Sequence, residues 1–146
     1  MRTVTIALAL LAAACGSQPK PLDPGHASKT DVYWRTLGSW SGRGNTQTPS
    51  FTSESGSLRL RWETRVVNPV NNANPGTFRL TAHSAISGRP IKLAVDEHGV
   101  GQGTAYVDDD PHVFYMVVES ANLDWAFTVD EAFAGTASAS DPSGKH

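Results

Sequence analysis

The sequence predicts an all-β protein whose body is a single antiparallel β-sandwich. Apolar and polar residues alternate with period two in several segments, which is typical of strands with one buried face. Clusters of turn-forming residues separate these segments, and the 146-residue chain contains 13 glycines and 9 prolines. No helical period runs between the alternating segments. Strands at this spacing without helices favour a sandwich or a small barrel.

The first element, residues 1–14, is expected to be a cleaved signal peptide. Met1 and Arg2 supply a basic start, and Val4–Ala14 is an almost unbroken apolar run. This run is too short to cross a bilayer as a helix, which takes about 20 residues, and it fits the apolar region of a secretory signal. Small residues then precede Cys15, the only cysteine, so the chain cannot form an internal disulfide.

Residues 11–15, LAAAC, resemble the cleavage site of bacterial lipoprotein precursors. The resemblance implies that Cys15 becomes the first residue, that its thiol takes a diacylglyceryl group, and that the new amino terminus is often acylated. It also implies a membrane partner through this lipid. Gly16 in place of aspartate implies passage to the outer membrane where the organism has one. Ala12 stands where that family most often has leucine, and the same alanines suit ordinary signal peptidase, which leaves free secretion as the alternative.

A flexible tether is expected over residues 15–31, the β-sandwich domain over 32–134 and a disordered tail over 135–146. Residues 16–31 contain three prolines, two glycines and hardly any large apolar side chains, so they cannot build a core. The tail is expected to fray as chain ends do. A short helix around Asp31–Leu37 is the interpretation for the start of the domain.

The strands of the domain follow from the alternation. Leu58–Trp62, Phe78–Ala82, Ile91–Val95 and Leu123–Val129 each place every second residue on an apolar face, and Trp62 and Trp125 share that face. His112–Glu119 is apolar at both parities, which predicts a central strand covered on both faces. The connections contain turn residues at 68–76, 87–90, 99–103 and 108–111.

The domain also resembles the small bacterial CUB-like β-sandwich modules, which have a jelly-roll arrangement and often occur in lipoproteins and secreted proteins. The residues that carry the resemblance are core aromatics and turn residues over positions 40–131: Gly42, Gly44, Thr46, Phe51, Leu58–Trp62, Phe114-Tyr115, Trp125, Phe127 and Val129. The resemblance implies a binding or structural role rather than catalysis. CUB domains often have two disulfides or a calcium site, and this chain can form no disulfide.

Charge is divided unevenly along the chain. The net charge of −2 argues against a nucleic-acid partner, which would call for a strong basic excess. Residues 31–95 contain eight Arg or Lys against three Asp or Glu, whereas residues 96–146 contain one Lys against ten Asp or Glu. The acidic residues fall at predicted strand ends, at 96–97, 108–110 and 130–131. Asp96, Asp108, Asp109 and Asp110 are therefore candidate calcium ligands, and the alternative is that these loops are simply solvated.

Two further sets of side chains are candidates for ligand contact. Arg59, Arg61 and Arg79, with Lys92, could form a basic stripe that binds an anion; the alternative is that they pair with acidic neighbours such as Glu63. Trp34 and Trp40 precede the clear alternation. They could stack on a sugar ring, or they could cover one open end of the sandwich.

No catalytic constellation is evident in the motifs. The glycine-rich segment at 99–104 lacks the residues of a phosphate loop, and Trp40 occupies the place that a nucleophilic serine would take in GSWSG. The sequence therefore predicts a lipid-anchored envelope protein, at the outer membrane where one exists, with a non-catalytic binding or structural role towards an envelope protein or glycan. One alternative is a carbohydrate-binding module. The other is an envelope hydrolase or metal-dependent enzyme in which His98, His112 and Asp108–Asp110 converge.

Overall fold

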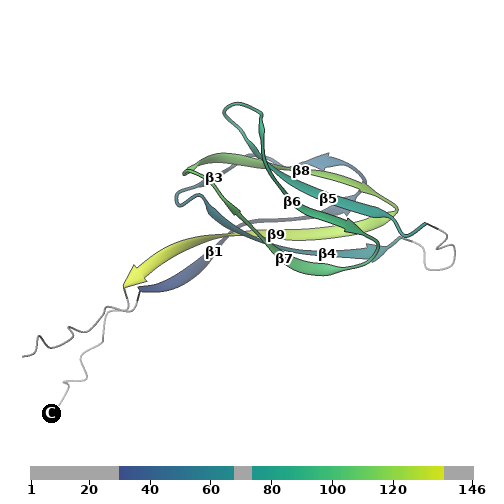
Figure 1. Cartoon of the computed structure of the whole chain (residues 1–146), viewed down its shortest axis with the longest axis horizontal. Coiled ribbons are helices and arrows are strands. Elements are labelled where there is room, and N and C mark those ends of the chain that lie inside the picture. The colour runs from purple at the N-terminus through teal and green to yellow at the C-terminus, as the bar shows by residue number, and fades with distance from the viewer. Residues whose placement is uncertain (1–29, 68–73, 137–146) are drawn as a thin grey trace, which may run out of the picture.

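The structure is a computed structural model that describes residues 30–67 and 74–136, and these form two antiparallel sheets packed face to face (Figure 1). This confirms the predicted all-β sandwich. The described strands begin at Thr30 and end at Thr136, two residues beyond each predicted domain boundary. The predicted signal peptide, Cys15, almost all of the tether and most of the tail lie outside the described residues.

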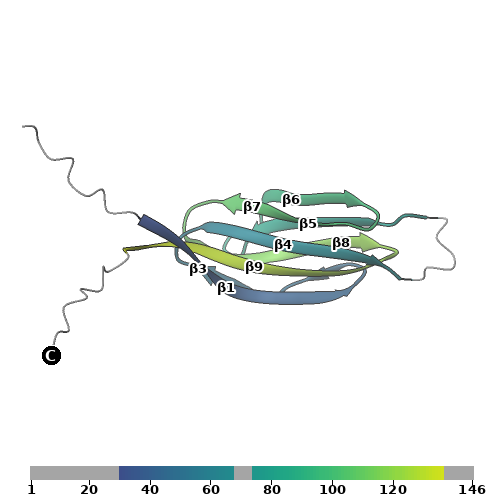
Figure 2. The same cartoon turned by 90° about the horizontal axis from the view of Figure 1, so that it is seen from below.

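The first sheet, sheet A, has the strand order β1-β9-β4-β7. Its strands are β1 (Thr30–Arg43), β9 (Leu123–Thr136), β4 (Ser57–Val66) and β7 (Gln102–Asp108). Figure 2 shows this sheet nearly face on, with β9 between β1 and β4. The first and last strands of the chain are thus neighbours.

The second sheet, sheet B, has β8 (His112–Ala121) and β5 (Thr77–Ser84) at its centre. The strand β6 (Pro90–His98) flanks β5. The short strands β2 (Thr46–Gln47) and β3 (Phe51–Ser53) both pair with β8, at opposite ends of it. Thr48, between them, donates its N–H to the carbonyl of Met116 and accepts the Met116 N–H on its hydroxyl, so the edge of β8 stays paired across this gap.

The core consists of the alternate residues that the two sheets direct at each other. Sheet A contributes Leu58, Leu60, Val107, Leu123, Trp125, Phe127 and Val129. Sheet B contributes Phe78, Leu80, Ala82, Val95, Phe114, Met116 and Val118. The alternation predicted for β4, β5 and β9 is therefore confirmed, with Trp62 as a partly buried neighbour of the core rather than a buried member.

Two strand predictions are wrong in part. Val95 is buried but Leu93 is 41% exposed, because Leu80 pairs with Val95 and Thr81 with Leu93, which leaves Ala94 as an extra residue in β6. The bulge turns Leu93 outward, and a second register shift opposite Ala82 and His83 follows it, so Ile91 still packs against the core. In β8 only one face is buried; the other, from Val113 to Val117, is half-buried, because among residues 30–67 and 74–136 no further layer packs on the outside of sheet B.

The predicted helix at Asp31–Leu37 is also wrong, because these residues belong to β1 and pair with β9. The last residue of β9 that pairs with β4 is Glu131, so residues 132–136 pair only with residues 30–34. We call this two-stranded extension the ribbon. Figure 1 shows it projecting beyond one end of the sandwich.

Candidate functional site

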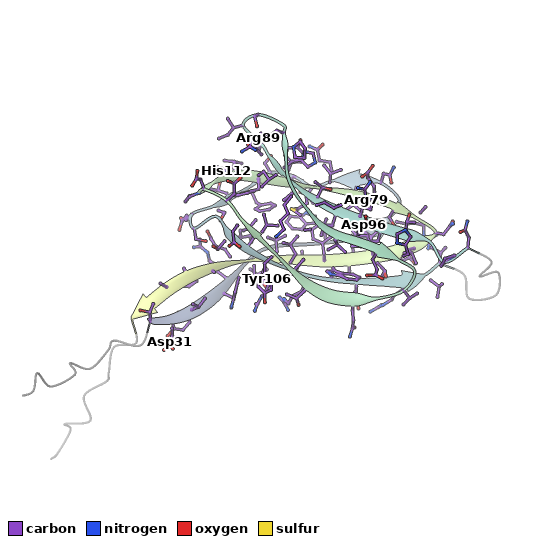
Figure 3. The ribbon with its side chains drawn as sticks, in the orientation of Figure 1. Asp31, Arg79, Arg89, Asp96, Tyr106 and His112 are labelled. Carbon is purple, nitrogen blue, oxygen red and sulfur yellow. The ribbon has the colours of Figure 1, made fainter. Side chains whose placement is uncertain are left out.

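The predicted basic stripe is not formed as one surface. Arg59 and Arg61 alternate with the buried residues of β4 and lie on the outer face of sheet A. Arg79 lies on the outer face of sheet B, where its guanidinium is 3.7 Å from both Asp96 and Glu119. The two groups are separated by the core because their strands belong to different sheets. Figure 3 shows Arg79 beside Asp96, away from the face that Tyr106 marks.

The four candidate calcium ligands do not come together either. Asp96 and Glu119 both pair with Arg79, which places Asp96 near the end of β8. Asp108–Asp110 lie at the β7–β8 connection, at the opposite end of the sandwich. Successive antiparallel strands reverse direction, so acidic residues at successive strand ends are sent to alternate ends. Among residues 30–67 and 74–136, no group of three or more His, Cys, Asp or Glu side chains is placed to hold a metal ion.

The residues of the enzyme alternative are likewise separated. His98 pairs with Thr77, which pairs with Ala121 at the far end of β8 from His112. His112 and Ala121 are nine residue steps apart along β8, which corresponds to about 30 Å. His112 stacks on Phe114, with ring centroids 3.9 Å apart, and its Nδ1 contacts the carbonyl oxygen of Asp110. His98 and His112 therefore do not contribute to one site.

The two candidate tryptophans have different surroundings. Trp40 is directed inward, with its ring centroid 5.8 Å from that of Phe51 and 5.3 Å from that of Phe127, so it belongs to the aromatic packing of the core edge. Trp34 is on the outer face of sheet A. The guanidinium carbon of Arg59 lies 4.3 Å from its ring centroid, and the ring of Tyr106 is 6.2 Å away.

Asp130 and Glu131 are not loop residues, because β9 continues to Thr136. Both side chains are about 1% exposed. Glu131 is directed into the end of the sandwich, where it accepts hydrogen bonds from the Arg35 guanidinium (2.7 Å), the Ser53 hydroxyl (2.8 Å) and the backbone N–H groups of Glu54 and Ser55. This carboxylate therefore holds the turn between β3 and β4.

The ionisation of Glu131 follows from these contacts. Burial by itself raises the pKa of the carboxyl, but the hydrogen bonds from Arg35, Ser55, Ser53 and Glu54 stabilise the charged form and together lower the pKa from 4.5 to about 2. The group is therefore charged at neutral pH although it is buried.

Asp130 is the matching carboxylate on the outer face of sheet A. It accepts hydrogen bonds from Arg59 (2.9 and 3.1 Å), from Arg61 (2.9 and 3.2 Å) and from the Thr36 hydroxyl (2.8 Å). Burial raises the pKa of this carboxyl, and the hydrogen bonds from Arg61, Thr36 and Arg59 outweigh burial, so that its pKa lies below the usual value. Two guanidiniums thus share one carboxylate, which leaves one positive charge in excess.

A shallow basin of about 670 Å³ lies beside this cluster on the outer face of sheet A. Cross-strand pairing arranges its side chains in rows that run across the sheet. One row consists of Ser39, Thr128, Arg61 and Thr104, and the next of Ser41, Ala126, Glu63 and Gln102.

The basin is hollow because its central positions carry small side chains. On β1 and β9 these are Ser39, Ser41, Ala126 and Thr128, and the Ser39 hydroxyl lies 2.8 Å from that of Thr128. Longer side chains form the rim. On the side of β4 and β7 these are Arg61, Glu63 and Gln102. The next row along β4 and β7 contains Arg59 and Tyr106, with Trp34 beside them, and these three side chains lie outside the lining of the hollow.

A second hollow of about 480 Å³ continues the basin along the strands and shares Ser41, Glu63 and Ala126 with it. Its far end is bounded by Arg43 and Asp124, whose side chains are 2.7 Å apart. The two hollows form a groove that runs along the strand direction. Its charged groups are paired across or along strands, as Glu63 is with Arg65 at 2.9 Å.

Sequence reasoning identified Arg59, Arg61 and Trp34 as candidates but missed the basin itself. Ser39, Ser41 and Thr128 are small polar residues that look like ordinary exposed positions when each strand is considered alone. Their meaning depends on the register of β1 against β9, which joins residues about ninety positions apart, for example Ser39 and Thr128. The one available signal was the repeated small residue at outward positions of these two strands.

The comparisons with known proteins found no matching family model and no curated protein of significantly similar sequence. Within the part of the chain that the structure describes, no helix has the length and apolar character needed to cross a membrane.

Proposed function

We propose that this protein is a non-catalytic binding module of the bacterial cell envelope, held to the outer membrane by lipid on Cys15, and that the basin on sheet A binds a saccharide. The observation that carries the proposal is a hollow with a floor of small hydroxyl side chains and a rim of ionised and amide groups.

The chemistry of the lining suits sugar hydroxyls. Ser39, Thr104 and Thr128 each offer a hydroxyl that donates and accepts, and Gln102 offers both functions on one amide. Arg61 and Glu63 add charged groups, whose hydrogen bonds are stronger than those between neutral partners. A ligand rich in hydroxyls can satisfy all of these groups at once.

An aromatic ring stands beside the polar floor. Tyr106 is 51% exposed and lies in the row next to the basin, with its ring centroid 6.2 Å from that of Trp34. The apolar face of a sugar ring packs on such a side chain, while its hydroxyls reach the polar groups next to it. Trp34 offers less of its ring to a ligand, because the guanidinium of Arg59 covers it.

The carboxylates around the basin support binding rather than cleavage. Glycoside hydrolysis generally uses two carboxyl groups about 5 to 10 Å apart on either side of the scissile bond. Among the residues that line the main hollow, Glu63 is the single carboxylate, and it is engaged by Arg65. No histidine is among those lining residues.

Substitution of one floor residue tests the proposal. Thr128→Tyr would fill the basin, and Thr81→Tyr is its matched control, because both threonines are half-buried on the outer faces of central strands, β9 and β5. Tyrosine is compatible with a strand at either position. The protein and both variants are titrated with envelope polysaccharides and soluble oligosaccharides by calorimetry or on a glycan array.

The expected result is binding of at least one saccharide by the wild-type protein, with affinity at least tenfold lower for Thr128→Tyr and within twofold for Thr81→Tyr. Equal binding by both variants would place the saccharide elsewhere. No binding of any saccharide by the wild-type protein would contradict the proposed ligand class.

A further inference from the structure

We propose that the ribbon rests in the headgroup region of a lipid bilayer, where it seats the domain on the membrane in a fixed orientation. The proposal rests on the lipid anchor of the proposed function but not on its saccharide site. The ribbon consists of residues 30–34 of β1 and 132–136 of β9.

The ribbon is apolar on both of its faces. Tyr33 pairs with Phe133 on one face, with ring centroids 5.9 Å apart, and Val32 pairs with Ala134 on the other. Val32 is 60% exposed, Tyr33 45% and Phe133 46%. Residues 30–34 and 132–136 contain a single charged side chain, Asp31, which Figure 3 shows at the outer end of the ribbon.

Exposure of this kind is unfavourable in water. An isolated pair of strands is at best marginally stable, and contiguous exposed apolar groups usually mark a surface that another phase or partner covers. Within the described residues, Arg59 and Tyr106 contact Trp34 at the base of the ribbon, whereas Val32, Tyr33 and Phe133 remain about half exposed. We therefore infer that a partner or a lipid phase covers these exposed side chains.

The position of the ribbon in the chain favours a bilayer as the phase that covers them. Thr30 pairs with Thr136, so β1 enters the fold at the ribbon's outer end. Fourteen residues, 16–29, separate Cys15 from Thr30 and reach at most about 50 Å when fully extended at about 3.4 Å each. A lipidated Cys15 would therefore attach the domain to the membrane through the ribbon's outer end.

The side chains are those that bilayer interfaces accept. Tyrosine is enriched at the level of the lipid headgroups, where its ring is in apolar surroundings and its hydroxyl is hydrated. Arg35, at the base of the ribbon, has its guanidinium 6.0 Å from the Phe133 ring centroid and is paired with Glu131. Because Asp31 is the only charge within the ribbon, the contact is expected with zwitterionic lipid and does not call for anionic lipid.

A single introduced thiol tests the contact. Cys15 is the only cysteine and its thiol is blocked when lipidated, so a new cysteine gives one site for an environment-sensitive fluorophore. Val32→Cys places the probe on the ribbon. Val100→Cys is the matched control, because Val100 is 59% exposed and lies in the β6–β7 turn at the other end of the sandwich. Tyr33→Cys gives a second ribbon site.

The full-length lipidated protein is reconstituted in phosphatidylcholine vesicles with nitroxide-labelled lipid. Both ribbon probes are expected to be quenched at least threefold more than the Val100 probe, and their emission to shift to shorter wavelength. Equal quenching at all three sites would overturn the proposal. So would a ribbon probe that is shielded only at high protein density and escapes the lipid quencher, since a second copy of the chain would then cover the ribbon.

The wild-type protein separates failure of the anchor from failure of the ribbon. Labelling of wild-type protein would show a free Cys15 thiol and contradict the anchor. In that case the protein is mixed with the same vesicles, and the signal of labelled wild-type protein is subtracted. The quenching of the ribbon probes is then compared with that of the Val100 probe. Selective quenching of the ribbon probes would still support the ribbon contact. Absence of selective quenching would overturn it.

Discussion

Replacing Glu131 with glutamine is expected to remove a pH-dependent part of the stability of the domain. The carboxylate accepts four hydrogen bonds, two of them from backbone N–H groups of the β3–β4 turn. Glutamine has one acceptor oxygen, and its NH₂ group would face donors. Leaving such buried groups unpaired costs about 3 kcal/mol at pH 7.

The pKa of Glu131 gives the pH dependence. Its pKa is 4.5 without the folded contacts and about 2 with them. A folded-state pKa that is depressed gives stability that is complete above the unfolded value and is lost as the pH falls towards the folded value. The whole contribution is about 3 kcal/mol, and about 2 kcal/mol of it is lost between pH 6 and pH 3.

Urea unfolding followed by tryptophan fluorescence at pH 6, 5, 4 and 3 measures this contribution. The free energy of unfolding of E131Q is expected to be lower than that of the wild type at pH 6, and the difference to shrink by about 2 kcal/mol at pH 3. Glu119→Gln is the control at pH 6, because Glu119 is 56% exposed and its ion pair with Arg79 contributes less than about 1 kcal/mol. A difference between E131Q and wild type that stays constant from pH 6 to pH 3 would refute the reasoning.

Two further pairs of variants test the packing. Phe127→Ala is expected to lower the free energy of unfolding by about 3 to 5 kcal/mol, because Phe127 is buried against Trp40 and Trp125. Phe133→Ala in lipid-free protein is expected to lower it by less than about 1 kcal/mol, because Phe133 is exposed. Equal losses would contradict the assigned core. Gly56→Ala and Gly44→Ala both place alanine at a φ near +70°, which costs about 1 kcal/mol. A Cβ at Gly56 would lie 1.8 Å from the carbonyl oxygen of Asp109, whereas a Cβ at Gly44 would meet no atom within 4 Å. Denaturant titration is therefore expected to show that Gly56→Ala is much less stable than Gly44→Ala.

The sequence was most informative where one strand alone decides the outcome. Leu58, Leu60 and Phe127 are buried as their period predicts, because alternation fixes the face of a residue without reference to partners. It was least informative where pairing decides. The bulge at Ala94 turns Leu93 outward. Asp130 continues a strand instead of ending one, because its charge is neutralised by Arg59 and Arg61 of the neighbouring strand.

The same reason explains the candidate site. Arg61 and Trp34 were recognisable by residue type, but their placement on the same outer face depends on the order β1-β9-β4-β7. The predicted convergence of Asp96 with Asp108–Asp110 failed for a related reason, since the ends to which successive strands lead follow from the topology. Side-chain chemistry can be read from a segment, whereas juxtaposition requires the pairing of segments distant in the chain.

The central place of β9 in sheet A has a consequence for the order of folding. Arg43 pairs with Asp124 and Thr30 with Thr136, so β1 has no partner in sheet A until the last strand has been synthesised. Contacts of such sequence separation form slowly, typically in milliseconds to seconds. A chain threaded N-terminus first through a translocation pore would thus remain unfolded until almost all of it had passed. One truncated before Leu123 would expose a 14-residue unpaired strand and is expected to aggregate rather than fold in part.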